Sequence, residues 1–161
     1  MLFRSFSLAL SNEILNEFGP AKVIVANFMV ANVDDLRDFM LGVKNLLAPD
    51  GVFAMETNYV SEVISNLLIE TLNHEHLSYF SVNSLSTFFA SLNLEMFDVK
   101  RVPSKNGSLR CFVKHQDAKY LVTDSVADAK NFENARGLFL ETSWNQFAGV
   151  IEHAREAARV Y

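Results

Sequence analysis

The segment whose side chains are best suited to catalysis covers residues 73–81, which read NHEHLSYFS. In it a glutamate stands between two histidines, and two aromatic residues follow. Histidine titrates near neutral pH and a carboxylate can orient or acidify its neighbour, so His74, Glu75 and His76 could supply a general base. In an extended backbone alternate side chains point to opposite sides, and the two histidines would then share one side. The alternative interpretation is a solvated polar loop without a catalytic role.

The same segment does not predict a metal site. His-x-His offers only two ligands, and the chain has no cluster of Cys or Asp residues to complete the set. The zinc-protease spacing His-Glu-x-x-His is not met either, because Ser78 follows Leu77. We therefore expect no bound metal.

Hydrophobic patterning around this segment predicts an α/β fold. Two short apolar runs, residues 22–28 and 52–56, flank the clearest amphipathic helix, whose stripe runs from Leu36 to Leu47. A strand, a helix and another strand are typical of a right-handed unit with parallel strands. Further helices are predicted over residues 8–18 and 60–72 and after a cap at Ser81 or Asn83, and further strands over residues 94–102 and 108–114.

The last two predicted strands are separated by residues 103–107, which read PSKNG. Asn-Gly favours turns with positive φ, so this segment predicts an antiparallel hairpin. From about Gln116 a short polar linker leads to residues 124–161. There one helical face carries apolar side chains, which predicts a C-terminal helix with a packing surface formed by Trp144, Phe147, Val150, Ile151, Ala154 and Ala158.

The composition of the chain excludes several classes of protein. Its 161 residues are 50% hydrophobic and 20% charged, which is typical of one globular domain. The net charge of −5 and the absence of a Lys/Arg run argue against nucleic-acid binding. The single cysteine, Cys111, excludes an internal disulfide. Without a signal peptide or an apolar run of roughly 18 residues, the expected protein is cytoplasmic and has no membrane partner.

Two polar residues lie where ligands commonly bind in this type of fold. Asn27 and Glu56 stand at the C-terminal ends of the two predicted parallel strands. Open α/β sheets bind their ligands at these strand ends, so both residues are candidates for binding. Ordinary hydrogen bonding at the start of a loop is the alternative interpretation.

The segment NHEHLSYFS resembles the Tyr-His-Glu-His-Leu-x-Tyr-Phe/Tyr-Ser signature of the S-adenosylmethionine-dependent sugar C-methyltransferases. The likeness continues upstream in KVIVANFMVANVDDLRDFMLGVKNLLAPDGVFAMETNY and downstream in SVNSLSTFFASLNLEMFDVKRVPSKNGSLRCFVKH. It covers most of residues 3–115 in several ordered blocks.

The resemblance implies a partial Rossmann-like class I methyltransferase sheet. The four strands would be strands four to seven of that fold, with the last one antiparallel, and would lie in the order first, second, fourth, third. Residues 1–115 would form the C-terminal half of the methyltransferase domain. Residues 116–161 would be a linker and a long helix that leads toward a further domain outside this chain. The first strand, around Ile24, would be an exposed apolar edge.

The resemblance also implies a reaction and the residues that perform it. Members of the family transfer a methyl group from S-adenosylmethionine to a carbon of a nucleotide-linked keto-deoxysugar by way of an enolate. His76 would be the base and Glu75 its acidic neighbour, with His74 beside them, and Asn27 would contact the cofactor. The implied substrate contacts are Glu56, Tyr59, Asn73, Tyr79 and Ser108.

Several positions depart from the family pattern. Asn73 and Asn32 replace a tyrosine and a histidine, and Lys105 stands where the family has an imidazole. None of the glycines forms a Gly-rich turn after a first strand, so the cofactor site is expected to be incomplete in this chain.

Two functions stay open. One is a C-methyltransferase of which this chain is part, and the other is a non-catalytic α/β interaction subunit or inactive fragment. The second would dock a partner, or another copy of itself, through the open sheet edge.

Overall fold

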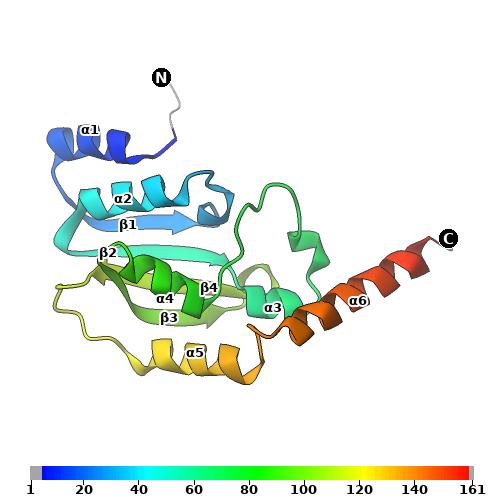
Figure 1. Ribbon diagram of the computed structural model, residues 1–161. Coiled ribbons are helices and arrows are strands. Elements are labelled where there is room, and N and C mark those ends of the chain that lie inside the picture. Colours follow the sequence, from blue (N-terminus) through cyan, green and yellow to red (C-terminus); the bar gives the residue numbers. More distant parts are fainter. Residues whose placement is uncertain (1–4, 160–161) are drawn as a thin grey trace.

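The computed structural model describes residues 5–159 and is built on one four-stranded mixed sheet (Figure 1). The order across the sheet is β1-β2-β4-β3. Strands β1 (Ala21–Asn27) and β2 (Leu47–Asn58) are parallel, and β4 (Ser108–His115) runs antiparallel to both β2 and β3 (Leu94–Val102). This is the predicted strand order, with the predicted hairpin and the predicted antiparallel last strand.

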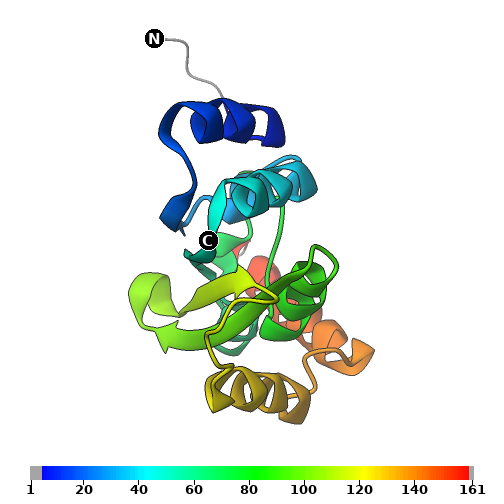
Figure 2. The same ribbon diagram turned by 90° about the vertical axis from the view of Figure 1, so that its left-hand side faces the viewer.

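Helices from three parts of the chain pack on one shared core. Side chains of α2, α4 and α5 join the inward-facing residues of the sheet, such as Phe53, Met55 and Cys111, while α1 packs against α2. Figure 2 shows these helices along one side of the strands. The bounds are α1 Leu8–Phe18, α2 Leu36–Leu46, α3 Val60–Ser65, α4 Val82–Ala90, α5 Asp124–Ala135 and α6 Glu141–Ala158, with short 3₁₀ turns η1 Val30–Asn32, η2 Ile69–Thr71 and η3 Ser104–Asn106.

Local capping explains why several helix bounds follow the sequence pattern. Ser7, Asp35 and Ser81 each accept a hydrogen bond from a backbone N–H in the first turn of the helix that follows. Such caps satisfy donors that have no partner within the helix. At the other end of α1, Gly19 takes a positive φ of 79°, which glycine adopts without steric cost. The predicted cap at Ser81 is confirmed.

Three boundaries differ from the prediction. Strand β2 begins at Leu47, because residues 48–51 bulge out between the register pairs Ala21–Leu47 and Val23–Val52 instead of ending in a turn. The helix expected over residues 60–72 ends at Ser65, and Leu67 then takes a positive φ of 51°. The expected long C-terminal helix is two helices, α5 and α6, separated by a turn in which Gly137 has φ 62°. The two predicted regions were residues 1–115 and 116–161. Residues 1–4 of the first and residues 160–161 of the second lie outside the described residues.

Strand β1 is an edge strand, as expected. Within residues 5–159 it pairs only with β2. Ile24 and Ala26 turn toward the core, whereas Val23 and Val25 stay 63% and 61% exposed on the opposite face. A free strand edge with exposed valines is a surface that favours pairing with another chain.

The side chain of Glu133 joins α5 to the sheet and to α4. It is fully buried, and its Oε1 accepts hydrogen bonds from the Tyr59 hydroxyl at 3.0 Å and from the backbone N–H of Val82. Its Oε2 accepts from the backbone N–H of Asn83 at 3.0 Å and from the Asn83 side-chain amide at 2.7 Å. One carboxylate therefore satisfies donors from the end of β2 and from the first turn of α4, where a negative charge is also favourable.

We predict that Glu133→Ala lowers the free energy of unfolding by at least about 3 kcal/mol, because each buried donor left without a partner costs roughly 1–3 kcal/mol. Urea unfolding followed by circular dichroism measures the change. The matched control is Asp128→Asn, which alters an exposed carboxylate on the same helix and should stay within about 0.5 kcal/mol of the original chain. Equal effects of the two substitutions would contradict the role given to Glu133.

Candidate active site

The segment NHEHLSYFS lies in the connection between α3 and α4, and backbone contacts fix its C-terminal half. The backbone N–H groups of Leu77 and Ser78 donate to the Ala31 carbonyl in η1, at 2.8 and 3.1 Å. Phe80 forms a short parallel bridge with Tyr59, directly after β2. The loop is therefore held against the turn that follows β1 and against the end of β2, at the edge where α/β sheets bind ligands.

His76 is oriented by the carbonyl of Thr71. Its Nδ1 lies 2.7 Å from the Thr71 oxygen, and because a carbonyl only accepts, Nδ1 carries the hydrogen. The Tyr79 hydroxyl donates to the same oxygen at 2.9 Å, and the two rings meet edge to face with centroids 6.0 Å apart. The half-buried imidazole is thus held as the tautomer whose Nε2 lone pair is free to accept a proton.

The residues before His76 form a turn instead of an extended strand. The His76 N–H donates to the Asn73 carbonyl at 3.3 Å, and the Asn73 side-chain oxygen accepts from the Glu75 N–H at 3.0 Å. Asn73, His74 and Glu75 are exposed. The shared side expected for His74 and His76 in an extended backbone does not occur, and in the described part of the chain no side-chain hydrogen bond links Glu75 to either histidine.

A polar row crosses three strands near the ends of β1 and β2. Asn27 lies beside Glu56 in the register of β1 and β2, and Glu56 lies beside Arg110 in the register of β2 and β4. The Glu56 side chain is 6% exposed, and its Oε2 accepts from Arg110 Nε at 2.9 Å and from Nη2 at 2.8 Å. The sequence did not indicate Arg110 as a site residue, because its contact with Glu56 depends on the register between β2 and β4. Asn27 stays exposed at the end of β1.

Tyr59 and Ser108, two of the candidate substrate contacts, are held by the fold. Tyr59 is fully buried, and burial, together with the adjacent Glu133 carboxylate, raises the pKa of its hydroxyl above the ordinary value. The hydroxyl therefore stays a donor to Glu133. The Ser108 hydroxyl donates to the Ser104 carbonyl at 2.7 Å within the hairpin. The end of β2 and the hairpin also meet through the backbone, since the Tyr59 N–H donates to the Gly107 carbonyl at 3.3 Å.

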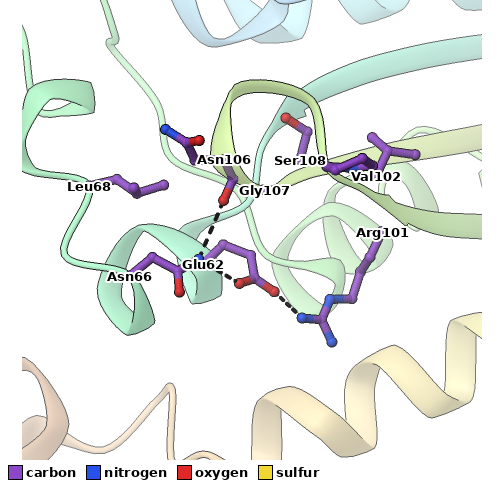
Figure 3. A pocket seen from close by; sticks show the side chains of 9 residues that line it. Glu62, Asn66, Leu68, Arg101, Val102, Asn106, Gly107 and Ser108 are labelled. Carbon is purple, nitrogen blue, oxygen red and sulfur yellow. Dashed lines mark hydrogen bonds and ion pairs between the residues drawn. The ribbon is translucent and has the colours of Figure 1, made fainter.

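A cavity of about 740 Å³ opens between α3 and the β3–β4 hairpin (Figure 3). Glu62 pairs with Arg101 across it, and Asn66 donates from its amide to Glu62 Oε2 at 3.0 Å and to the Asn106 carbonyl at 3.3 Å. Gly107 has φ 135°, and a Cβ there would lie 2.6 Å from Glu62 Cβ. Ser108 is the one candidate site residue from the sequence that lines this cavity. The other lining residues were not singled out, because the walls come from segments far apart in the chain.

The hairpin also reaches the end of β1. The Lys105 ammonium lies 4.2 Å from the centroid of the Phe28 ring, within the range of a cation–π contact. Both residues have positive φ, 49° for Lys105 and 51° for Phe28, a conformation that is uncommon for large side chains. The positive side chain of Lys105 is therefore placed beside the first residue after β1.

Within residues 5–159, no group of three or more His, Cys, Asp or Glu side chains is placed so that it could hold a metal ion. Over the same residues, no helix has the length and apolar character needed to cross a membrane.

Comparisons with known proteins agree with this fold. No protein-family model matches the chain. The C-methyltransferase NovU of Streptomyces niveus is 33% identical over 154 residues, which cover 96% of this chain and 37% of NovU. The chain thus spans well under half of that relative. A crystal structure of a SAM-dependent methyltransferase from Anabaena variabilis matches with a TM-score of 0.51 and 13% identity, over 71% of this chain and 57% of the other. The chain is homologous to a segment of a C-methyltransferase and carries part of a methyltransferase fold.

Proposed function

We propose that this chain is part of an enzyme that transfers a methyl group from S-adenosylmethionine to a carbon of a nucleotide-linked keto-deoxysugar. The observation that carries the proposal is the hydrogen bond from His76 Nδ1 to the Thr71 carbonyl, which leaves Nε2 as a base. The identity of 33% with NovU over nearly the whole chain supports the reaction class.

In this proposal His76 removes a proton from the carbon beside the sugar ketone. The carbon–hydrogen bond breaks, the proton goes to Nε2, and the electron pair moves to the ketone oxygen. Tyr79 keeps the imidazole in place through the shared Thr71 carbonyl. General-base catalysis requires this kind of fixed tautomer and position.

The other candidate residues have supporting roles in this proposal. Asn27 contacts the cofactor, while Glu56, held by Arg110, forms a polar wall beside it. His74 and Glu75 lie in the exposed turn before His76, where Asn73 and the half-buried Tyr79 remain the candidate substrate contacts. Tyr59 and Ser108 are buried and support the site through their positions in the fold. Residues 1–115 then represent strands four to seven of a methyltransferase domain, and residues 116–161 the linker and helices that follow it.

S-adenosylmethionine supplies an activated methyl group when it is bound, but residues 5–159 do not form a complete site for it. The six glycines lie at a helix end, within helices, in the β2 bulge, in the hairpin and in the α5–α6 turn. None lies in a turn from a strand to a helix, where backbone N–H groups commonly approach such a ligand. Asn27 is the one candidate cofactor contact among the described residues.

We predict that His76→Asn lowers methyl transfer by roughly 10²–10⁴-fold, the usual contribution of a general base. The measurement uses a NovU chimera in which this chain replaces the matched segment. Affinity for S-adenosylmethionine should change by no more than a few fold, since His76 is assigned to the sugar.

The matched control in the same chimera is His74→Asn, which alters an exposed histidine of the preceding turn and should keep most of the activity. Loss of activity in His74→Asn with full activity in His76→Asn would move the base by two residues. Full activity in both variants would make the loop structural.

We also predict that the purified chain alone binds S-adenosylmethionine weakly or not at all, because it lacks a Gly-rich turn. Isothermal titration calorimetry tests this directly. Dissociation in the low micromolar range would show that a complete cofactor site exists elsewhere in the chain.

The exposed edge strand supports a second candidate function, that of an interaction subunit. The N–H of Phe28 donates to the Glu56 carbonyl in β2. In a parallel strand the N–H and C=O groups of successive residues point alternately to one neighbour and to the other side, so the backbone groups of Val23, Val25 and Asn27 face the open side of β1. We expect copies of the chain to associate there, because no other strand of residues 5–159 pairs with these groups and the two valines stay exposed.

Sedimentation velocity at increasing concentration should then show self-association of the original chain, and Val25→Lys should abolish it. The matched control is Val122→Lys, which places the same charge at another exposed valine, in the segment before α5. An original chain that stays monomeric at high concentration would refute this role for β1.

A further inference from the structure

The cavity between α3 and the β3–β4 hairpin has balanced charge and mixed polarity. Its charged lining residues are Glu62 and Arg101, and these two pair with each other. Leu68, Val102 and Pro103 supply apolar surface beside them. A site for a phosphate needs an excess of positive charge, which this lining lacks. Its volume of about 740 Å³ lies within the usual range for small-molecule sites.

The Glu62 carboxylate has acceptor capacity left for a ligand. Oε1 accepts from Arg101 and Oε2 accepts from the Asn66 amide at 3.0 Å. A carboxylate offers about four acceptor positions, so about one on each oxygen remains. Glu62 is also held in place, because Arg101 in turn lies over the Phe132 ring, 4.3 Å from its centroid. Two neighbouring acceptors in a fixed orientation suit two adjacent hydroxyl groups.

Arg101 and Asn66 extend this polar wall. The Arg101 side chain is 48% exposed against 12% for Glu62, so the guanidinium keeps N–H groups that can reach a ligand. Asn66 also donates to the Asn106 carbonyl, which ties the end of α3 to the hairpin and fixes the width of the cavity. Figure 3 shows these side chains converging on one opening, with Leu68 and Val102 to either side.

We infer that this cavity binds an uncharged, hydroxyl-bearing ring, a sugar, with Glu62 accepting from adjacent hydroxyls. The cavity is lined by α3, the segment after it and the hairpin, and His76 is not among its lining residues, so this site is additional to the one of the proposed function. The apolar side chains cover the carbon–hydrogen surface of the ring, and Arg101 donates to a ring or hydroxyl oxygen.

The experiment is a ¹H–¹⁵N NMR titration of the whole chain with three probes: glucose, UDP-glucose and UDP. Glucose and UDP-glucose should shift the backbone amides of Asn66, Asn106 and Gly107, and UDP should leave them unchanged. Because the free sugar makes few contacts, its dissociation constant should be about 1–10 mM.

Glu62→Gln should weaken glucose binding by about tenfold or more, since hydrogen bonds to a charged group contribute roughly 1.5–3 kcal/mol. Glu152→Gln is the matched control, because it removes the charge of another ion-paired glutamate, on α6, and should not change binding. Val102→Phe narrows the cavity without touching the ion pair and should also weaken binding, which keeps the test decisive if Glu62→Gln does not fold.

Absence of amide shifts at about 10 mM sugar would overturn the inference, as would equal shifts with UDP alone. Unchanged glucose affinity in folded Glu62→Gln would overturn it as well. These results are separable from the proposed function. If His76→Asn abolishes methyl transfer in the chimera but the chain binds no sugar, only the cavity inference fails. If the chain binds sugar but the chimera with His76 intact is inactive, only the proposed reaction fails.

Discussion

The buried carboxylate of Glu133 is the contact on which the arrangement of the site depends. It comes from the region after the hairpin, yet its partners are Tyr59, the residue directly after β2, and the first turn of α4. The loop with His76 runs between these two points, so Glu133 fixes the positions from which the loop starts and to which it returns. Burial raises the pKa of the nearby Cys111 thiol to about 12, with Glu133 adding to the rise, which keeps the surrounding core free of a second negative charge.

Much of the fold follows from local signals and from the family resemblance. The caps at Asp35 and Ser81 are visible in the sequence because their side chains act within the next turn. The strand order could be predicted only through the resemblance, since periodicity does not say which strands are neighbours. The misplaced start of β2 and the break at Gly137 have another origin. A bulge and a single turn of positive φ depend on what packs around them, and local pattern does not encode this.

The candidate site shows the same division. The segment with His76 stood out by residue type, but the contact that defines its tautomer, the carbonyl of Thr71, belongs to the backbone and leaves no mark in the sequence. Arg110 and Arg101 were not singled out for a related reason. Each meets its carboxylate across a long stretch of chain, so only the folded sheet reveals that Glu56 and Glu62 have partners. Residue identity therefore located the chemistry, and tertiary structure determined which groups remain free to act.

The close approach of Gly107 to α3 means that the two walls of the cavity tolerate substitution to different degrees. A side chain at position 107 meets the Cβ of residue 62 itself, so shortening Glu62 to alanine gives no relief. Position 107 is therefore held to glycine by almost any residue opposite it, and its positive φ adds to that requirement. Position 62 can change beyond its Cβ without disturbing the contact. Variation among related chains should accordingly concentrate on the helix wall, where ligand preference could drift while the hairpin wall stays constant.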